Sequence, residues 1–94
     1  MKLVLSPRAA EDLEEIGDYI ARDNPERALS FVAEIEARCR KLLAAPEAFP
    51  GRDDLLSGAR MATYGRYLIF FRVLDDTVRV ERVIHGAREL RDLL

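Results

Sequence analysis

The chain has 94 residues but only one cysteine, one histidine and no long apolar run, and each shortage excludes a class of protein. With Cys39 alone, no intrachain disulfide can form, which fits a reducing compartment. No apolar run approaches the ~20 residues that a membrane helix needs. The N-terminal residues also lack the apolar core of a signal peptide. We therefore expect one cytoplasmic domain over residues 1–94, without a membrane partner.

Histidine is too scarce to support a metal site. Carboxylates gather on the first predicted helix, at Glu11, Glu14, Glu15 and Asp18. The only histidine, His85, is far from them in the sequence, and carboxylates alone are typical of a solvated helix face. The sequence therefore predicts neither a metal site nor a cofactor.

The net charge of -2 conceals an uneven distribution. Residues 1–50 carry seven basic and ten acidic side chains, whereas residues 60–94 carry seven arginines and five acidic side chains. The arginines are Arg60, Arg66, Arg72, Arg79, Arg82, Arg88 and Arg91. Mixed charge usually indicates a solvated surface, and the alternative is a basic face that meets an acidic partner.

Two helices are predicted from their start signals. Ser6-Pro7 and Asn24-Pro25 each combine a capping side chain with proline at the first helical position. Apolar residues then follow at helical spacing, at Ala9, Leu13, Ile16 and Ile20 in the first helix and at Ala28, Phe31, Val32, Ile35, Cys39, Leu42 and Leu43 in the second. The second helix should end near residue 45. The short loop between them predicts an antiparallel helix hairpin.

Strands are predicted at 2–5, 59–63, 64–74 and 78–86, and an exposed polar loop at 52–58. In the long strand, Tyr67, Ile69, Phe71 and Val73 face one way, and Leu68, Phe70 and Arg72 face the other. The helices can cover only one of these apolar faces, so the other face should be open to a partner. We expect an α+β fold: an N-terminal strand, an antiparallel helix hairpin, then a three-stranded antiparallel sheet with the helices on one face.

The last strand is interrupted at Arg82. In a regular strand Val78, Val80 and Ile84 share a face with Arg82, while Val83 points away. A buried arginine would need a carboxylate partner, and a β-bulge near Glu81 would also explain the break.

Several motifs, in this order, resemble the ParE toxins of the RelE/ParE toxin–antitoxin superfamily. They are Ser6-Pro7-x-Ala9, Asp12-Leu13-x-x-Ile16-x-x-Tyr19-Ile20, Asn24-Pro25-x-x-Ala28, Leu42 with Pro46, Gly65-Arg66-Tyr67-x-Ile69-x-Phe71-Arg72-Val73, and Val83-x-His85-Gly86-x-Arg88. The resemblance implies a small antiparallel sheet with two helices on one side. It also implies a toxin that a ParD-type antitoxin holds inactive. ParE-type toxins are generally taken to inhibit DNA gyrase, whereas RelE-type toxins cut mRNA on the ribosome.

The positions that resemble the RelE nuclease site are mostly changed in this chain. The stretch 60–66 before Tyr67 contains no lysine, Leu68 replaces an arginine, and leucine fills the C-terminal tyrosine position. Arg88 alone matches. The favoured reading is therefore a toxin without a catalytic site. The alternative is a ribosome-dependent endoribonuclease with a reduced site of His85, Arg88 and Tyr67, and a further alternative is a non-toxic binding module.

Binding surfaces follow from the same resemblance. The antitoxin is expected to contact Leu68, Phe70, Arg72 and Arg66, and the target to contact Arg60, His85 and Arg88. On this view Phe70→Glu should abolish antitoxin binding while the helices stay folded. No specific DNA binding is expected from this chain alone.

Overall fold

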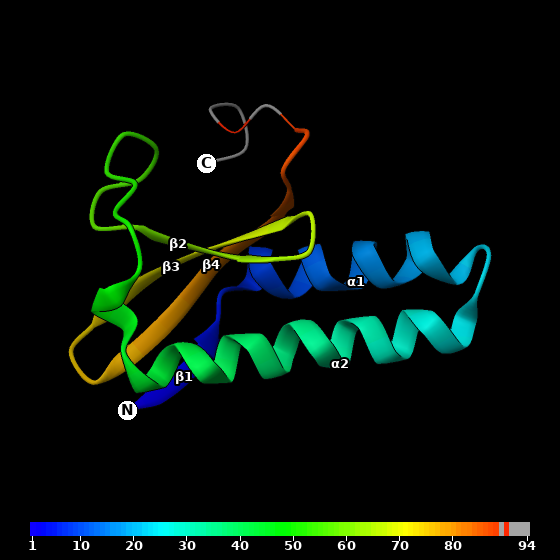
Figure 1. The fold of residues 1–94 in the computed structure, drawn as a ribbon, viewed down its shortest axis with the longest axis horizontal. Coiled ribbons are helices and arrows are strands. Elements are labelled where there is room, and N and C mark those ends of the chain that lie inside the picture. Colours follow the sequence, from blue (N-terminus) through cyan, green and yellow to red (C-terminus); the bar gives the residue numbers. More distant parts are fainter. Residues whose placement is uncertain (89, 91–94) are drawn as a thin grey trace.

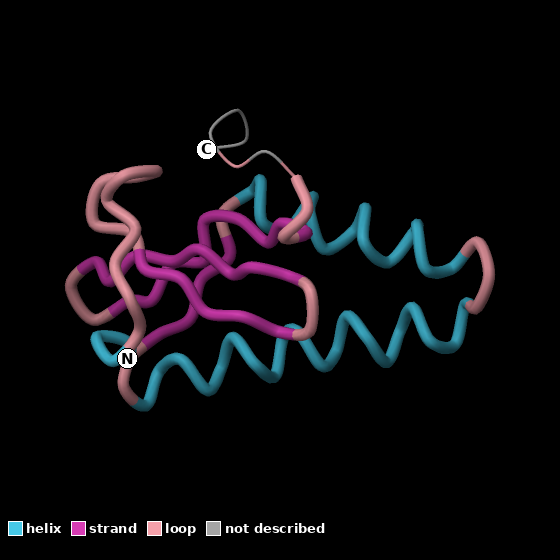
Figure 2. Tube along the Cα trace, turned by 45° about the horizontal axis from the view of Figure 1, so that its top comes forward, coloured by secondary structure: helices cyan, strands magenta, loops and turns pink. Residues whose placement is uncertain are grey.

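The structure, a computed structural model, describes residues 1–88 and 90. Its elements are β1 (Lys2–Leu5), α1 (Pro7–Ala21), α2 (Pro25–Lys41), β2 (Arg60–Tyr64), β3 (Tyr67–Leu74) and β4 (Thr77–His85). Two short 3-10 turns, Leu42–Ala44 and Pro46–Ala48, follow α2. Figure 1 and Figure 2 show the two helices side by side, with the loop that joins them extending past the end of the sheet.

The α+β fold is confirmed, and the sheet has four strands in the order β1-β4-β3-β2. Strands β2, β3 and β4 pair antiparallel, as predicted. The N-terminal strand β1 pairs parallel to β4, so Leu3 lies opposite Val78 and Leu5 opposite Val80. A parallel neighbour requires a crossover connection, and the helix hairpin that follows β1 is part of it.

Both helix starts have the predicted caps. Ser6 Oγ accepts a hydrogen bond from the Ala9 N–H at 3.0 Å, and Asn24 Oδ1 accepts one from the Arg27 N–H at 3.0 Å. The α-helical part of α2 ends at Lys41, and the chain up to Ala44 tightens into a 3-10 turn. The predicted end near residue 45 is therefore a few residues too late. Such differences are common because the last turn of an α-helix is often a 3-10 turn.

The main core lies between the helix hairpin and one face of the sheet. Buried residues of both helices, including Leu13, Ile16 and Ile35, pack against Ile69 and Phe71 of the central strand β3. Cys39 is also fully buried there, as its phase on α2 predicts.

Strand β4 contains the predicted bulge. Phe71 pairs with Val80 whereas Phe70 pairs with Arg82, so Glu81 is the extra residue. One added residue exchanges the two faces of the strand beyond it. Val83 therefore joins the core, and the expectation that Ile84 shares a face with Val78 and Val80 is wrong.

The buried arginine also has its carboxylate partner. Arg82 Nε and Nη2 donate to Asp12 Oδ2 and Oδ1 at 2.8 and 3.0 Å, and the two side chains are only 7% and 5% exposed. The Val83 N–H donates to the same Asp12 Oδ2 at 2.9 Å. The hydrogen bond with Asp12 raises the pKa of Arg82, so the guanidinium stays charged.

Ser6 supplies a second attachment between α1 and the bulge. Its N–H donates to the Val80 carbonyl and its Oγ donates to the Glu81 carbonyl, both at 2.8 Å. The pairing of β1 with β4 ends at Leu5 and Val80. Beyond Val80, the backbone groups along this edge of β4 therefore hydrogen-bond with Ser6 and Asp12 instead of with β1.

The opposite face of the sheet is less open than the sequence suggested. Phe70 and Ile84 are fully buried. The segment after Pro50 folds back along β2, because the Arg52 N–H donates to the Ala59 carbonyl at 2.7 Å and the Met61 N–H to the Pro50 carbonyl at 3.0 Å.

The expectation of a wholly exposed 52–58 loop is also wrong. Leu55 and Leu56 are half-buried, and Leu56 lines a cleft with Arg72. Phe70→Glu would therefore bury a charge without a partner and lower stability. It is not a selective test of antitoxin binding.

We predict that Asp12→Ala lowers the free energy of unfolding by about 3–5 kcal/mol, because it leaves the Arg82 charge buried without its partner. Urea unfolding followed by circular dichroism measures this. Glu14→Ala, at an exposed position of the same helix, is the matched control and should change stability by less than about 0.5 kcal/mol. Equal losses for the two variants would contradict the role of Asp12.

Candidate functional site

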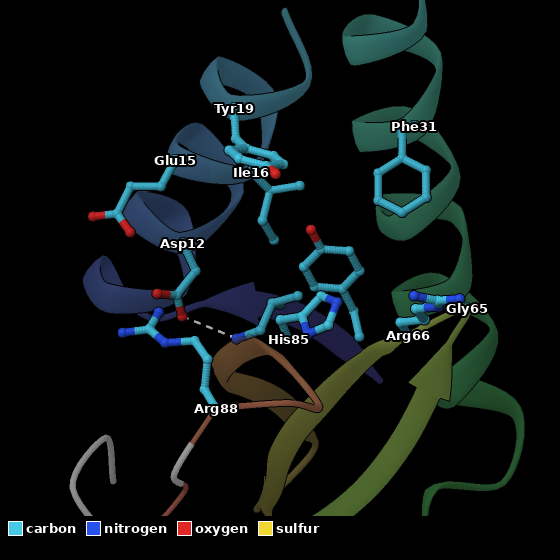
Figure 3. Close-up of a pocket in the computed structure, with 11 residues that line it drawn as sticks. Asp12, Glu15, Ile16, Tyr19, Phe31, Gly65, Arg66, His85 and Arg88 are labelled. Carbon is cyan, nitrogen blue, oxygen red and sulfur yellow. Dashed lines mark hydrogen bonds between the residues drawn. The ribbon is translucent and has the colours of Figure 1, made fainter. Parts of the chain in front are cut away.

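The helix hairpin and the end of the sheet enclose a cleft of about 610 Å³, which we call the hairpin cleft. Asp12, Glu15, Ile16 and Tyr19 reach it from α1 and Phe31 from α2. The turn between β2 and β3 contributes Gly65 and Arg66, and the sheet end contributes Tyr67, Val83, His85 and Arg88. Figure 3 shows these side chains converging from segments distant in sequence.

Aromatic rings form the floor of the hairpin cleft. Phe31 packs against Tyr64 and Tyr67 with ring centroids 5.7 and 5.6 Å apart. Tyr67 in turn meets the His85 ring edge-on, with centroids 5.2 Å apart. Such tilted and edge-to-face contacts are favourable beyond the area they bury. The floor is therefore a packed surface whose rings hold one another in place.

A hydrogen-bonded network ties this floor to α2. The Tyr64 hydroxyl donates to Glu34 Oε1, and Arg27 Nη1 pairs with Glu34 Oε2 at 2.6 Å. The hydrogen bonds from Arg27 and then Tyr64 lower the pKa of Glu34. The same contact with Glu34 raises the pKa of Tyr64, so that hydroxyl remains a proton donor.

Charged side chains stand on both sides of the aromatic floor. In Figure 3, Asp12, Glu15 and Arg88 lie on one side and Arg66 lies on the other. Arg66 and Arg88 are exposed. Two arginines that flank an apolar floor suit a protein segment that carries acidic and apolar side chains.

His85 is poorly placed to accept a proton. Its Nδ1 accepts a hydrogen bond from the Ala87 N–H at 3.1 Å. A backbone N–H can only donate, so Nδ1 carries no hydrogen and the neutral ring holds its proton on Nε2. His85 could act as a base only if it first lost the Ala87 contact. Burial also raises the pKa of Tyr67, which keeps that hydroxyl neutral.

The residues predicted for target binding are only partly brought together. His85 and Arg88 line the hairpin cleft with Tyr67, so the three residues of the alternative nuclease site do meet. Arg60 lies elsewhere, because its Nη1 donates to the carbonyls of Glu47 and Phe49 at 3.1 and 2.7 Å. Arg60 thus holds the segment after α2 against β2.

The predicted antitoxin contacts are divided as well. Leu68, Phe70 and Arg72 lie on the sheet face opposite the helices, where Phe70 is buried and Arg72 is paired with Glu81 at 2.7 Å. Arg66 is at the rim of the hairpin cleft instead. No single surface contains all four residues.

The sequence analysis did not assign seven residues of the cleft to a site: Asp12, Glu15, Ile16, Tyr19, Phe31, Gly65 and Val83. Asp12 was named only within a motif of the family, and Phe31 only among the apolar residues of the second helix. One signal could have identified Asp12. It lies three residues after Ala9 and four before Ile16, within the buried arc of α1, where a carboxylate requires a partner.

The described part of the chain contains no group of three or more histidine, cysteine, aspartate or glutamate residues that could hold a metal ion. In residues 1–88 and 90, no helix is both long and apolar enough to cross a membrane.

Comparison with known proteins places the chain in a family. The profile described as "ParE toxin of type II toxin-antitoxin system, parDE" matches residues 3–90. The chain therefore belongs to the ParE toxin family of type II toxin–antitoxin systems.

A solved structure agrees with this assignment. The fold is similar to that of a chain in the "Chromosomal ParDE TA system from P. aeruginosa", with a TM-score of 0.78 and 28% sequence identity. The match covers 90% of this chain and 95% of that one. No curated protein sequence matches the chain significantly.

We predict that Cys39 does not react as a nucleophile in the folded protein. The side chain is fully buried, and burial raises the pKa of its thiol to about 11. At pH 8, Ellman's reagent should therefore label the native protein far more slowly than protein in 6 M guanidinium chloride. Equal rates in the two conditions would show that the thiol is accessible.

Proposed function

We propose that this ParE-family protein arrests growth by binding DNA gyrase, and that a ParD-like antitoxin neutralises it. Family membership over residues 3–90 supports the toxin role, and the ParDE system of similar fold supports an antitoxin partner. The observation that carries the proposal is the hairpin cleft. This cleft has an aromatic floor between two arginines. The Nδ1 lone pair of its histidine, His85, already accepts a hydrogen bond from the Ala87 N–H.

Binding rather than catalysis fits this geometry. Cleavage of RNA through its 2′-hydroxyl needs a proton acceptor, a proton donor and cations around the phosphate. The cleft has cations in Arg66 and Arg88, whereas His85 would have to break its contact with Ala87 to accept a proton. The target is therefore gripped at the cleft rim, by Arg66, His85 and Arg88.

The antitoxin covers more than one surface in this proposal. An amphipathic helix lies along the helix hairpin, and an extended segment lies against the sheet. Because Arg66 and Arg72 are on different faces, one straight segment cannot meet both. The antitoxin must wrap around the edge of the sheet to contact the two arginines.

The proposal predicts that the purified protein inhibits gyrase supercoiling and that Arg88→Glu weakens inhibition at least about tenfold, by reversing a charge at the rim. A supercoiling assay measures both. Arg40→Glu makes the same charge change at an exposed site of α2 outside the hairpin cleft and should inhibit like the wild type. Absence of inhibition or of trapped cleavage at excess protein would rule out gyrase as the target.

A ribosome-dependent endoribonuclease is the second candidate, because Tyr67, His85 and Arg88 do line one cleft. Primer extension on ribosome-bound mRNA separates the two functions. The gyrase proposal predicts no cuts, whereas A-site cuts that disappear in His85→Gln would establish the nuclease. Normal growth on induction without antitoxin would instead indicate a non-toxic binding module.

A further inference from the structure

A second cleft, the arginine cleft, lies on the sheet face opposite the helix hairpin and has a volume of about 420 Å³. Arg72 of β3 and Arg79 of β4 are register partners there. Arg8 from the start of α1 and Leu56 from the segment before β2 complete its walls. The neighbours Phe71 and Val80 belong to the core, so the alternation of the strands directs Arg72 and Arg79 away from the helices.

Positive charge is in excess in the arginine cleft. Glu81, the bulge residue, accepts hydrogen bonds from Arg72 Nε at 2.7 Å and from Arg79 Nε at 3.1 Å. Arg8 also borders the cleft, where it pairs at the surface with Glu11. Arg82 is neutralised by Asp12. The carboxylate of Glu81 therefore pairs with two guanidinium groups, which leaves the cleft positively charged. The chain as a whole has a net charge of -2.

The guanidinium groups can bind a further acceptor. Within residues 1–88 and 90, Arg79 donates one hydrogen bond, from Nε, which leaves its Nη groups available. The Arg72 and Arg79 side chains are 33% and 37% exposed, whereas that of Glu81 is 11% exposed. An incoming carboxylate would meet the guanidinium groups at the surface, with Glu81 beneath them.

The surroundings favour a peptide over a nucleic acid. Leu56 lines the cleft, and Val4, 40% exposed, lies beside Arg79 in the sheet register. These side chains offer apolar contacts between the charges. Among the described residues no aromatic ring lines the arginine cleft, so it lacks the stacking surface on which single-stranded nucleic acids depend. Alternating acidic and apolar side chains of an extended peptide match it better.

We infer that the arginine cleft binds an acidic, extended segment of the antitoxin. One carboxylate bridges Arg79 and Arg72 above Glu81, and a neighbouring apolar side chain lies against Leu56 and Val4. The inference rests on the proposed antitoxin partnership. It adds the binding site and the chemistry of the segment. It also places the antitoxin over the surface that carries Arg8 and Arg79.

The test measures the affinity of the full-length chain for the ParD-like antitoxin of the proposed partnership, at 150 mM salt. Arg79→Glu should weaken binding about 10–100-fold, because it places a second carboxylate beside Glu81. Arg52→Glu is the matched control, because Arg52 lies outside both clefts and both helices and also loses an ion pair, with Asp54; it should change affinity less than about twofold. Thermal melts establish that each variant is folded, and Arg79→Gln replaces Arg79→Glu if the latter does not fold.

The outcomes separate this inference from the proposed function. If the wild type does not bind the ParD-like antitoxin, the partnership itself fails. If it binds and Arg79→Glu binds equally well, the inference alone is overturned. Restored binding of Arg79→Glu by an antitoxin with lysine at one acidic position would confirm the contact. Binding of a 20-base-pair DNA duplex that Arg79→Glu abolishes, with antitoxin affinity unchanged, would overturn it in favour of nucleic acid.

Discussion

The carboxylate of Asp12 connects the two halves of this fold. It accepts two hydrogen bonds from Arg82 and one from the Val83 N–H, at the place where β4 has lost β1 as its neighbour. A buried ion pair adds little net stability over an apolar pair. Loss of one partner, however, is strongly destabilising because it leaves the other charge buried without compensation. Three segments therefore have to form together: the Glu81 bulge, the end of β1 and the first turns of α1.

The same ion pair stands between the two clefts. Asp12 lines the hairpin cleft and Arg82 lines the arginine cleft. The bulge places the Glu81 carboxylate against Arg72 and Arg79, while the strand beyond it brings Val83 and His85 to the helix side. The one extra residue in β4 thus determines which side chains of this strand face the hairpin cleft and which face the arginine cleft. In our account the hairpin cleft grips the target, and the arginine cleft receives the extended segment of the antitoxin.

Local patterns were enough to predict the helices, the hairpin strands and the alternation of β3, because caps and apolar periodicity act over a few residues. The motifs also indicated the family. The site was harder to predict because it depends on contacts distant in sequence. Arg82 signalled a carboxylate or a bulge, but its partner Asp12 is 70 residues away. The burial of Phe70 could not be foreseen, since it depends on three-dimensional packing on that face, which periodicity along the strand does not report.

Hydrogen exchange at the Val83 amide tests the central claim most directly. This N–H is at an edge of β4 that β1 does not cover, and Asp12 is its acceptor. Our account predicts that the amide exchanges as slowly as the amides of the buried strand β3 and becomes fast in Asp12→Asn, because an amide side chain weakens both contacts. Fast exchange of Val83 in the wild-type protein would show that Asp12 does not hold α1 to the sheet, and would contradict the account.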